Sequence, residues 1–199
     1  MNAATVLTRP DYEVIASFLQ PGERVLDLGC GDGSLLRYLK ETLNVRGYGV
    51  EIEPARVLAS IRNGVNVIQS DLETGLSGFG DGAFDHVILS LTLQAMRNTE
   101  GALKELLRVG RDAIVSFPNF GYWRHRSAIL NGRMPVSETL PYQWYNTPNL
   151  RFFTMADFEA LCQTLGIIIR DRRALDGGTV VTDEPNFMAS VAVYRLRAG

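Results

Sequence analysis

Cysteine is scarce in this sequence of 199 residues, which has only Cys30 and Cys162. Two cysteines cannot build a disulfide framework, and their surroundings lack the spacing of metal-ligating residues. Long apolar runs are also missing, because no stretch approaches the roughly 20 residues that span a bilayer. Residues 1–10 lack the basic and then apolar pattern of a signal peptide. We therefore expect a cytoplasmic protein without a metal site and without a membrane partner.

An excess of charge of either sign is missing as well. The formal net charge is −2 and the pI is near 5.7, so the overall charge does not attract nucleic acid. A nucleic-acid substrate would need a local basic patch. Apolar residues make up 46% of the chain and charged residues 21%, a balance that allows a continuous core in a chain of one-domain length.

Short apolar or β-branched runs alternate with helical patterns along most of the chain, which indicates a parallel sheet with crossover helices. The seven predicted strands are residues 24–28, 47–52, 65–69, 84–91, 113–117, 167–172 and 188–196. The predicted helices are residues 10–19, 34–43, 54–64, 99–109 and 154–166. In the third helix, Val57, Leu58 and Ile61 should form the buried stripe. In the last helix, Thr154 and Asp157 have the spacing of a capping box.

Residues 118–153 interrupt this alternation. They are rich in aromatic residues, proline, asparagine and glycine, and they show little sustained periodicity. Linkers are not this aromatic, so we interpret the segment as an insertion or lid over the carboxyl edge of the sheet. It would belong to a single domain that covers residues 1–199.

A strand that runs into a glycine-rich turn stands at residues 25–33, with the sequence VLDLGCGDG. Glycines let such a turn bring its backbone close to a ligand. The third glycine is Gly33, whereas a dinucleotide fingerprint would place it at Ser34. Asp27 also lies within the end of the strand, where a carboxylate does not suit a pyrophosphate. It suits a ligand that carries an ammonium and a sulfonium group, because nearby negative charge favours each cation.

Two further carboxylates follow later strands. Glu51 lies at the end of the second predicted strand, where it can accept from both ribose hydroxyls of a ligand. Glu53 is better interpreted as the cap before Pro54. Asp71 follows the third strand and can accept from an adenine amino group, with the Leu72 backbone beside it; the alternative is a solvated turn aspartate.

Four segments together resemble the class I S-adenosylmethionine-dependent methyltransferases. They are VLDLGCGDG (25–33), YGVEIE (48–53), QSDLE (69–73) and FDHVILSLTLQ (84–94). The resemblance implies an α/β, Rossmann-like fold with a seven-stranded, mostly parallel sheet and helices on both faces. It also implies S-adenosylmethionine as cofactor, with S-adenosylhomocysteine as product or inhibitor. The implied cofactor-binding residues are Asp27, Gly29, Cys30, Gly31, Glu51, Ile52, Asp71, Leu72, Ser90 and Leu91.

Two segments of the second half narrow this resemblance. SFPNFGYWRHR (116–126) and GRMPVSETLPYQWYNTPNLRFFT (132–154) are similar to the MetW family of methionine-biosynthesis proteins. That resemblance implies binding of S-adenosylmethionine and support or regulation of homoserine O-acyltransferase, at the first committed step of methionine synthesis. From the residues alone, the aromatic and arginine side chains suit a partner surface, a pocket for a small carboxylate, or the core of a lid.

No catalytic base stands out. His86 lies within an apolar strand and is more simply explained as a structural histidine. His125 is a weak candidate base near the expected substrate entrance, and a surface position between Arg124 and Arg126 is equally consistent with the sequence. After the fourth strand, SLTLQ (90–94) lacks the Asn-Pro-Pro-aromatic tetrapeptide of many N-methyltransferases. The donor site is therefore better specified than an acceptor site.

Three functional hypotheses follow. The first is the MetW-like role beside homoserine O-acyltransferase. The second is a stand-alone S-adenosylmethionine-dependent methyltransferase that acts on a small molecule, such as a carboxylate or hydroxyl compound. The third, methylation of nucleic acid, ranks last because the charge balance is unsuitable and no basic stripe accompanies the aromatic residues.

Overall fold

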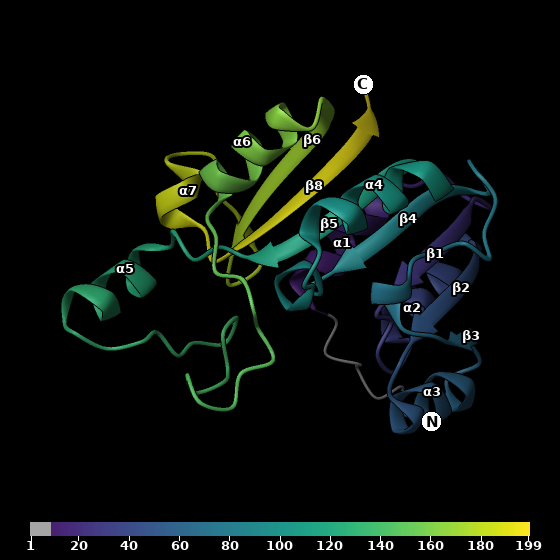
Figure 1. Ribbon diagram of the computed structural model, residues 1–199, viewed down its shortest axis with the longest axis horizontal. Helices are drawn as coiled ribbons and strands as arrows, with labels where there is room; N and C mark the ends of the chain where they lie inside the picture. The colour runs from purple at the N-terminus through teal and green to yellow at the C-terminus, as the bar shows by residue number, and fades with distance from the viewer. Residues whose placement is uncertain (1–8) are drawn as a thin grey trace.

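Eight strands form one mixed sheet in the computed structural model, which describes residues 9–199 (Figure 1). Along the sheet they lie in the order β3-β2-β1-β4-β5-β8-β6-β7. The strands are β1 (Arg24–Leu28), β2 (Arg46–Glu51), β3 (Asn66–Gln69), β4 (Phe84–Ser90), β5 (Gly110–Pro118), β6 (Ile167–Asp176), β7 (Thr179–Val180) and β8 (Val191–Ala198). The helices are α1 (Pro10–Ser17), α2 (Ser34–Leu43), α3 (Pro54–Arg62), α4 (Thr99–Val109), α5 (Trp123–Leu130), α6 (Met155–Thr164) and α7 (Pro185–Met188), with 3-10 turns η1 (Leu72–Thr74) and η2 (Leu93–Ala95).

The order of the strands reverses between β1 and β4. From β1 the chain moves outward to β2 and β3, and it then returns to the other side of β1 with β4 and β5; these pairs are all parallel. β8 then pairs with β5, and β6 pairs with β8, and both of these pairs are antiparallel. Open α/β sheets bind ligands where the order reverses, at the carboxyl ends of the strands. The fold therefore directs attention to the ends of β1 and β4.

Helices cover both faces of the sheet. On one face, α1 and α2 pack through Ile15 and Leu39. On the other, α4 and α6 pack through Leu103 and Phe158. Because the central strands are covered on both sides, they are apolar nearly throughout. The predicted α/β, Rossmann-like fold with a mostly parallel sheet is confirmed.

The eighth strand was not predicted. Gly177 and Gly178 both have positive φ, of 52° and 89°, and they form a two-residue turn that pairs Asp176 with Thr179. Such a glycine pair is a strong hairpin signal. The returning strand β7 has only two residues, which is too short for any alternation of apolar and polar residues to reveal it.

The predicted buried stripe on α3 is wrong. Leu58 and Ile61 are 55% and 57% exposed, Val57 is half-buried, and Ser60 is the buried residue. The hydroxyl of Ser60 donates to the carbonyl of Gly31 at 2.9 Å. The helix therefore packs with its small polar residue on the glycine-rich loop and leaves its large apolar residues outside.

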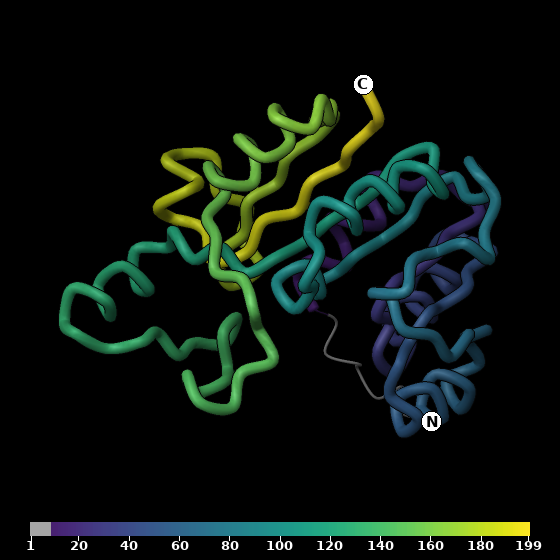
Figure 2. The backbone as a smooth tube through the Cα atoms, in the orientation of Figure 1, coloured from purple at the N-terminus to yellow at the C-terminus, as the bar shows by residue number. Residues whose placement is uncertain are grey.

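Residues 118–153 contain one helix that was not predicted, α5, and otherwise an irregular backbone. Figure 2 shows this segment leaving the end of β5, extending away from the sheet and returning to α6. Only His125 of α5 is buried, so the helix has no inward apolar stripe from which a pattern could be recognised. At the return, Thr154 and Asp157 form the predicted capping box of α6.

Candidate functional site

The loop between β1 and α2 holds three glycines in the left-handed region, with φ of 71° at Gly29, 60° at Gly31 and 77° at Gly33. A Cβ at Gly29 would lie 2.8 Å from Oγ1 of Thr92, so a side chain does not fit there. A Cβ at Gly31 would meet nothing within 4 Å. The loop therefore packs tightly against Thr92 at Gly29, whereas the space beside Gly31 is empty. A ligand can approach the loop backbone at Gly31.

Asp27 lies next to this loop and is only 2% exposed. Its carboxylate has no hydrogen-bond partner among residues 9–199. Burial raises the pKa of Asp27 to about 7; the Arg9 guanidinium opposes this shift, and the carboxyl groups of Asp11 and Glu51 add to it. A buried carboxyl group without a partner is unfavourable, and a ligand cation would be a partner for it.

Glu51 ends β2 with its carboxylate bonded to backbone N–H groups. Its Oε2 accepts from Gly31 at 3.0 Å, and its Oε1 accepts from Ile52 and Glu53 at 2.8 and 3.0 Å. It is 5% exposed and joins the end of β2 to the glycine-rich loop. Glu53 occupies the predicted N-cap position of α3, but its side chain pairs with Arg56 at 2.7 Å and makes no cap bond.

Asp71 follows β3 and is exposed. Its Oδ1 accepts from the N–H of Glu73 at 2.9 Å, so it caps the turn η1. Leu72 beside it is half-buried and lines an apolar cavity between the sheet and α4, together with Leu28 and Met96. The turn uses one oxygen of the Asp71 carboxylate.

The end of β4 is held in an unusual conformation. Leu91 has a φ of 49°, in the left-handed region that is rare for leucine. Its N–H donates to the carbonyl of Ser116 at 2.9 Å, and the hydroxyl oxygens of Ser90 and Ser116 lie 3.1 Å apart. Strain of this kind persists where surrounding bonds fix it, and it often marks functional sites.

Sequence reasoning missed Arg9 and Asp11. Two hydrogen bonds of 3.0 and 2.6 Å join the Arg9 guanidinium to Asp11, and a third of 2.6 Å joins it to the hydroxyl of Ser90. Asp11 is 4% exposed and also accepts from Ser116. Since Arg9 and Ser90 are 81 positions apart, no local spacing relates them. The result is a guanidinium that lies at the end of β4 and partly offsets the rise that burial causes in the pKa of Asp27.

The structure does not bring His125 into this group. It is 1% exposed, which excludes the predicted surface position. Its Nδ1 bonds to the carbonyl of Asn119 at 3.0 Å and its Nε2 to the hydroxyl of Ser137 at 2.9 Å. Burial lowers the pKa of His125, so the ring is neutral, with Nδ1 donating and Nε2 accepting. Both nitrogens are engaged in bonds that hold residues 119–137 together.

His86 is buried in β4, far along the strand from its carboxyl end. Its Nδ1 lies 3.1 Å from a carboxylate oxygen of Glu23 and its Nε2 lies 4.0 Å from one of Asp112. The first contact lacks the direction of a hydrogen bond and the second is too long for one. Burial lowers its pKa, against the raising effect of both carboxylates. Burial likewise raises the pKa of Cys30 and of Cys162 to about 12, so neither thiol is a nucleophile at neutral pH.

Within residues 9–199 there is no group of three or more His, Cys, Asp or Glu side chains that could hold a metal ion. No helix in that part of the chain is long and apolar enough to cross a membrane.

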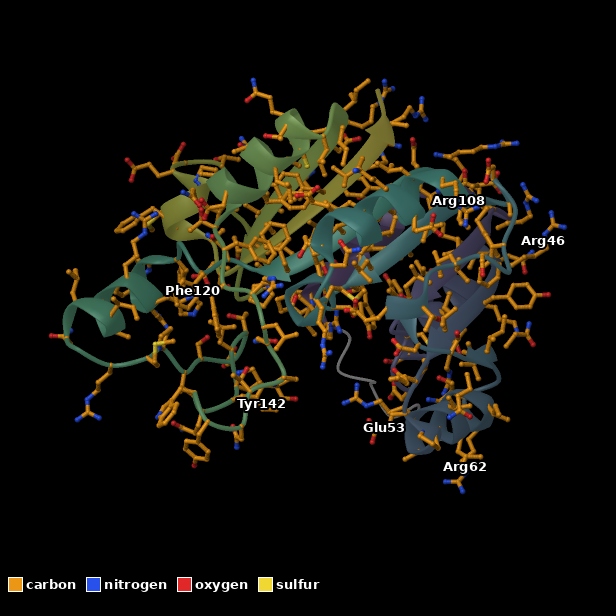
Figure 3. All side chains as sticks on the ribbon, in the orientation of Figure 1. Arg46, Glu53, Arg62, Arg108, Phe120 and Tyr142 are labelled. Carbon is orange, nitrogen blue, oxygen red and sulfur yellow. The ribbon has the colours of Figure 1, made fainter. Side chains whose placement is uncertain are left out.

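Four of the elements thus converge on one end of the sheet: β1 with Asp27, the glycine-rich loop, β2 with Glu51, and β4 with Ser90. In Figure 3, Glu53 marks the carboxyl end of β2 and Arg46 the opposite end of the same strand. A buried carboxylate that makes no hydrogen bond within residues 9–199, an open glycine backbone and a second buried carboxylate suit a ligand with a cationic end and hydroxyl groups.

Comparison with sequence families gives a match over residues 9–196 to the family described as methionine biosynthesis protein MetW. The bifunctional methionine biosynthesis protein MetXA/MetW of Rhodopirellula baltica is 41% identical over 197 residues, which is 92% of this chain and 32% of that protein. The ribosomal protein L11 methyltransferase of Ralstonia nicotianae is 33% identical over 112 residues, which is 55% of this chain and 37% of that protein. The chain therefore spans about a third of the length of these curated relatives.

Among solved structures, a possible histamine N-methyltransferase of Thermotoga maritima has a TM-score of 0.69 and 20% identity, over 95% of this chain and 88% of that one. The magnesium protoporphyrin IX methyltransferase of Synechocystis, solved with bound SAH, has a TM-score of 0.65 and 19% identity, over 94% and 82%. Both are methyltransferases by their descriptions, the first of them SAM-dependent, and the likeness shows that this chain has their fold.

Proposed function

Because the chain belongs to the MetW family of methionine-biosynthesis proteins, we propose that it binds S-adenosylmethionine and supports or regulates homoserine O-acyltransferase. The cofactor, when bound, supplies a methyl group on a positively charged sulfur. It is also the downstream product of the methionine pathway, so its binding would let the chain report how much of that product is present.

The observation that carries the cofactor proposal is the buried carboxylate of Asp27, which makes no hydrogen bond to the described residues, beside the open backbone of Gly31. We assign Asp27 and the loop residues 29–31 to the methionine part of the cofactor. Its ammonium and sulfonium groups would favour the ionised form of Asp27.

The remaining assignments follow the strand ends. Glu51 with Ile52 would hold the ribose, and Asp71 with Leu72 would hold the adenine. Ser90 and Leu91 would line the cofactor near its sulfonium group, and the left-handed backbone of Leu91 supports this assignment.

The partner proposal is supported by the protein of Rhodopirellula baltica, whose name pairs MetXA with MetW in one chain. This chain covers only 32% of it, so most of that protein is the other unit. We take that unit to be the acyltransferase that the family resemblance implies. Two units that are joined in one protein have a high effective concentration for each other, and separate chains need a docking surface instead.

Replacement of Glu51 by alanine tests the cofactor site. Glu51→Ala should weaken S-adenosylmethionine binding by about 1.5–3 kcal/mol, the usual range for a hydrogen bond to a charged group. Glu53→Ala is the matched control, because Glu53 is exposed and, among the described residues, its side chain pairs with Arg56 alone. Titration calorimetry measures both affinities. Equal affinity for wild type and Glu51→Ala would refute the ribose assignment.

Homoserine acylation by the acyltransferase of the same source tests the partner role. The rate and the amount of soluble acyltransferase are measured with and without this chain, at several concentrations of S-adenosylmethionine. We expect a clear rise with the chain and a dependence on the cofactor. No change in either quantity, with no co-purification, would contradict the proposal.

One observation favours the second candidate, a stand-alone small-molecule methyltransferase. The Arg9 guanidinium lies at Ser90 and its side chain is 41% exposed. Its Nε and Nη2 are bonded to Asp11 and Ser90, but its Nη1 makes no hydrogen bond within residues 9–199 and could donate to a carboxylate acceptor. The purified chain is mixed with S-adenosylmethionine and a panel of small acids. Accumulation of S-adenosylhomocysteine with one acid, abolished by Arg9→Ala, would favour this candidate over the regulatory role.

A further inference from the structure

Residues 123–152 expose an unusual share of the apolar side chains. In the described part of the chain, 19 large hydrophobic residues are exposed, and ten of them lie in this segment. They are Trp123, Ile129, Leu130, Met134, Val136, Tyr142, Trp144, Tyr145, Leu150 and Phe152. We call these ten side chains the aromatic surface. Large exposed apolar side chains gathered in one segment mark a candidate interaction site.

The aromatic surface lies at the periphery of the molecule. In Figure 1, α5 projects beyond the carboxyl end of β5, on the side away from α3 and β3. Figure 3 shows Phe120 where the segment leaves the sheet and Tyr142 at the far end of the following loop. A lid core would bury its aromatic residues, whereas Trp144 and Tyr145 are each 71% exposed.

The backbone that carries the aromatic surface is held in place. Buried His125 links Asn119 to Ser137, as described above. The hydroxyl of Tyr122 donates to Asp176 at 3.1 Å, which ties the start of α5 to β6. At the other end, the carbonyl of Gln94 accepts from the N–H groups of Leu150 and Arg151, both at 2.9 Å. A surface fixed in this way loses little conformational entropy when a partner binds.

The charge of the segment is positive. Residues 118–153 contain four arginines and one carboxylate, Glu138, in a chain whose formal net charge is −2. The Arg124 guanidinium lies 5.3 Å from the Trp123 ring centroid, and Arg126 lies 5.3 Å from that of Phe187 on α7. Tryptophan, tyrosine and arginine are the residues that dominate protein–protein hot spots.

We infer that the aromatic surface is where this chain docks on homoserine O-acyltransferase, against an apolar patch rimmed with carboxylates. The inference rests on the proposed function and adds the place of contact. A protein partner is favoured over nucleic acid because aliphatic residues share the surface: Leu130 is 87% exposed, with Met134 and Val136 nearby in sequence. Two of the four arginines already donate to backbone carbonyls, Arg126 to that of Gly121 and Arg151 to that of Arg97, so these donors are not free to bind phosphate groups.

The exposed face of α3 provides a matched control. Leu58 and Ile61 are exposed to a similar extent, but they lie at the β3 end of the sheet, next to the glycine-rich loop rather than on α5. No cationic ring contact accompanies them within the described residues. Removal of two exposed apolar side chains at each place separates a specific docking surface from non-specific hydrophobic association.

The experiment uses the whole chain and the purified acyltransferase of the same source. The variants are Trp144→Ala with Tyr145→Ala, Leu130→Glu, and the control Leu58→Ala with Ile61→Ala. Affinity is measured by titration calorimetry, and circular dichroism and S-adenosylmethionine binding verify that each variant is folded. We expect at least tenfold weaker acyltransferase binding for each aromatic-surface variant and less than twofold change for the control.

If both aromatic-surface variants bind the acyltransferase as tightly as the wild type does, or if only the α3 control loses binding, the inference is overturned while the partner role stands. Failure of the wild type to bind the acyltransferase at all would instead overturn the proposed partner itself.

Two further measurements test other occupants of the aromatic surface, the first by size-exclusion chromatography. A wild-type dimer that Trp144→Ala with Tyr145→Ala converts to monomer, with acyltransferase binding intact, would assign the surface to a second copy. Tighter binding to an RNA oligonucleotide than to the acyltransferase would assign it to nucleic acid.

Discussion

At the carboxyl ends of β1 and β2 the chain buries Asp27 and Glu51, whereas on α5 and the loop after it the chain exposes tryptophan and tyrosine. In the first region, carboxylates lie where apolar groups are usual, and in the second, aromatic rings lie where polar groups are usual. Each arrangement is unfavourable in the isolated chain. The unfavourable group in each region indicates the kind of ligand that would stabilise it. A cation would stabilise the buried carboxylate, and an apolar protein surface would cover the exposed rings.

The two regions also differ in how tightly they are built. Around the glycine-rich loop a single Cβ has no room at Gly29, while Gly132 at the end of α5 has open space around it. Tight packing fixes a small ligand's position within fractions of an ångström, whereas a protein partner is bound through large exposed side chains that need no such close packing around them. Substitutions should therefore affect folding strongly in the first region and weakly in the second.

The largest effect is expected at Gly29. A valine there meets Thr92 and must adopt a φ of 71°, so Gly29→Val should lower the free energy of unfolding by about 3–5 kcal/mol. Gly31→Val is the matched control, since its φ is 60° but nothing lies within 4 Å. It should lose only about 1–2 kcal/mol from backbone strain and yet lose cofactor binding. Urea denaturation measures both. Equal destabilisation by the two variants would mean that Gly29 is not uniquely crowded.

The next effect depends on pH. Burial raises the folded-state pKa of Asp27 to about 7, above its unfolded value of about 3.9. Below about pH 4 the group is protonated in both states; above about pH 7 the folded chain bears the full unfavourable burial of the ionised form. Stability should therefore fall between these limits as pH rises. Asp27→Asn removes this term and should gain about 2–4 kcal/mol at pH 8 relative to wild type.

The gain from Asp27→Asn should shrink at pH 5 and vanish near pH 4, which denaturation of both proteins across this range will measure. A gain that is the same at all pH values would show that Asp27 does not titrate as proposed. Cofactor binding has the opposite dependence. Since the ligand cation favours the ionised carboxyl group, wild-type affinity should rise with pH up to about 7, and binding below that pH should release a proton.

Sequence predicted the region of β1 and α2 well, and both elements have the predicted bounds. The glycines, the strand pattern and the helix stripe there are all local signals. The contact between Arg9 and Ser90 could not be predicted, because it depends on how α1 folds over the sheet. The helix α5 was missed for a related reason. Its apolar residues face outward, so the usual stripe is absent, and whether the segment was lid core or surface depended on tertiary packing.

Gln94 is where the two regions meet. Its side-chain Nε2 donates to the carbonyl of strained Leu91 at 2.6 Å, its Oε1 is buried without a partner among residues 9–199, and its backbone carbonyl holds Leu150 and Arg151. Gln94→Leu removes the bond to Leu91 and should cost about 1 kcal/mol of stability. It should also reduce the effect of S-adenosylmethionine on acyltransferase binding. Gln143→Leu, an exposed glutamine of the loop after α5, is the control. Cofactor dependence that survives Gln94→Leu intact would rule out this route of coupling.

The smallest effect on folding is expected where the side chains are largest. Trp144 and Tyr145 contact each other edge to face but are each 71% exposed, so Trp144→Ala with Tyr145→Ala should change the free energy of unfolding by less than about 0.5 kcal/mol. Cofactor affinity should also be unchanged. Buried aromatic residues lose about 3–5 kcal/mol on truncation, so the measurement discriminates sharply between a surface and a lid core. A loss above about 1 kcal/mol would show that these rings stabilise the fold through packing. The segment would then not be an exposed partner surface, and its contrast with the tightly packed ligand site would not hold.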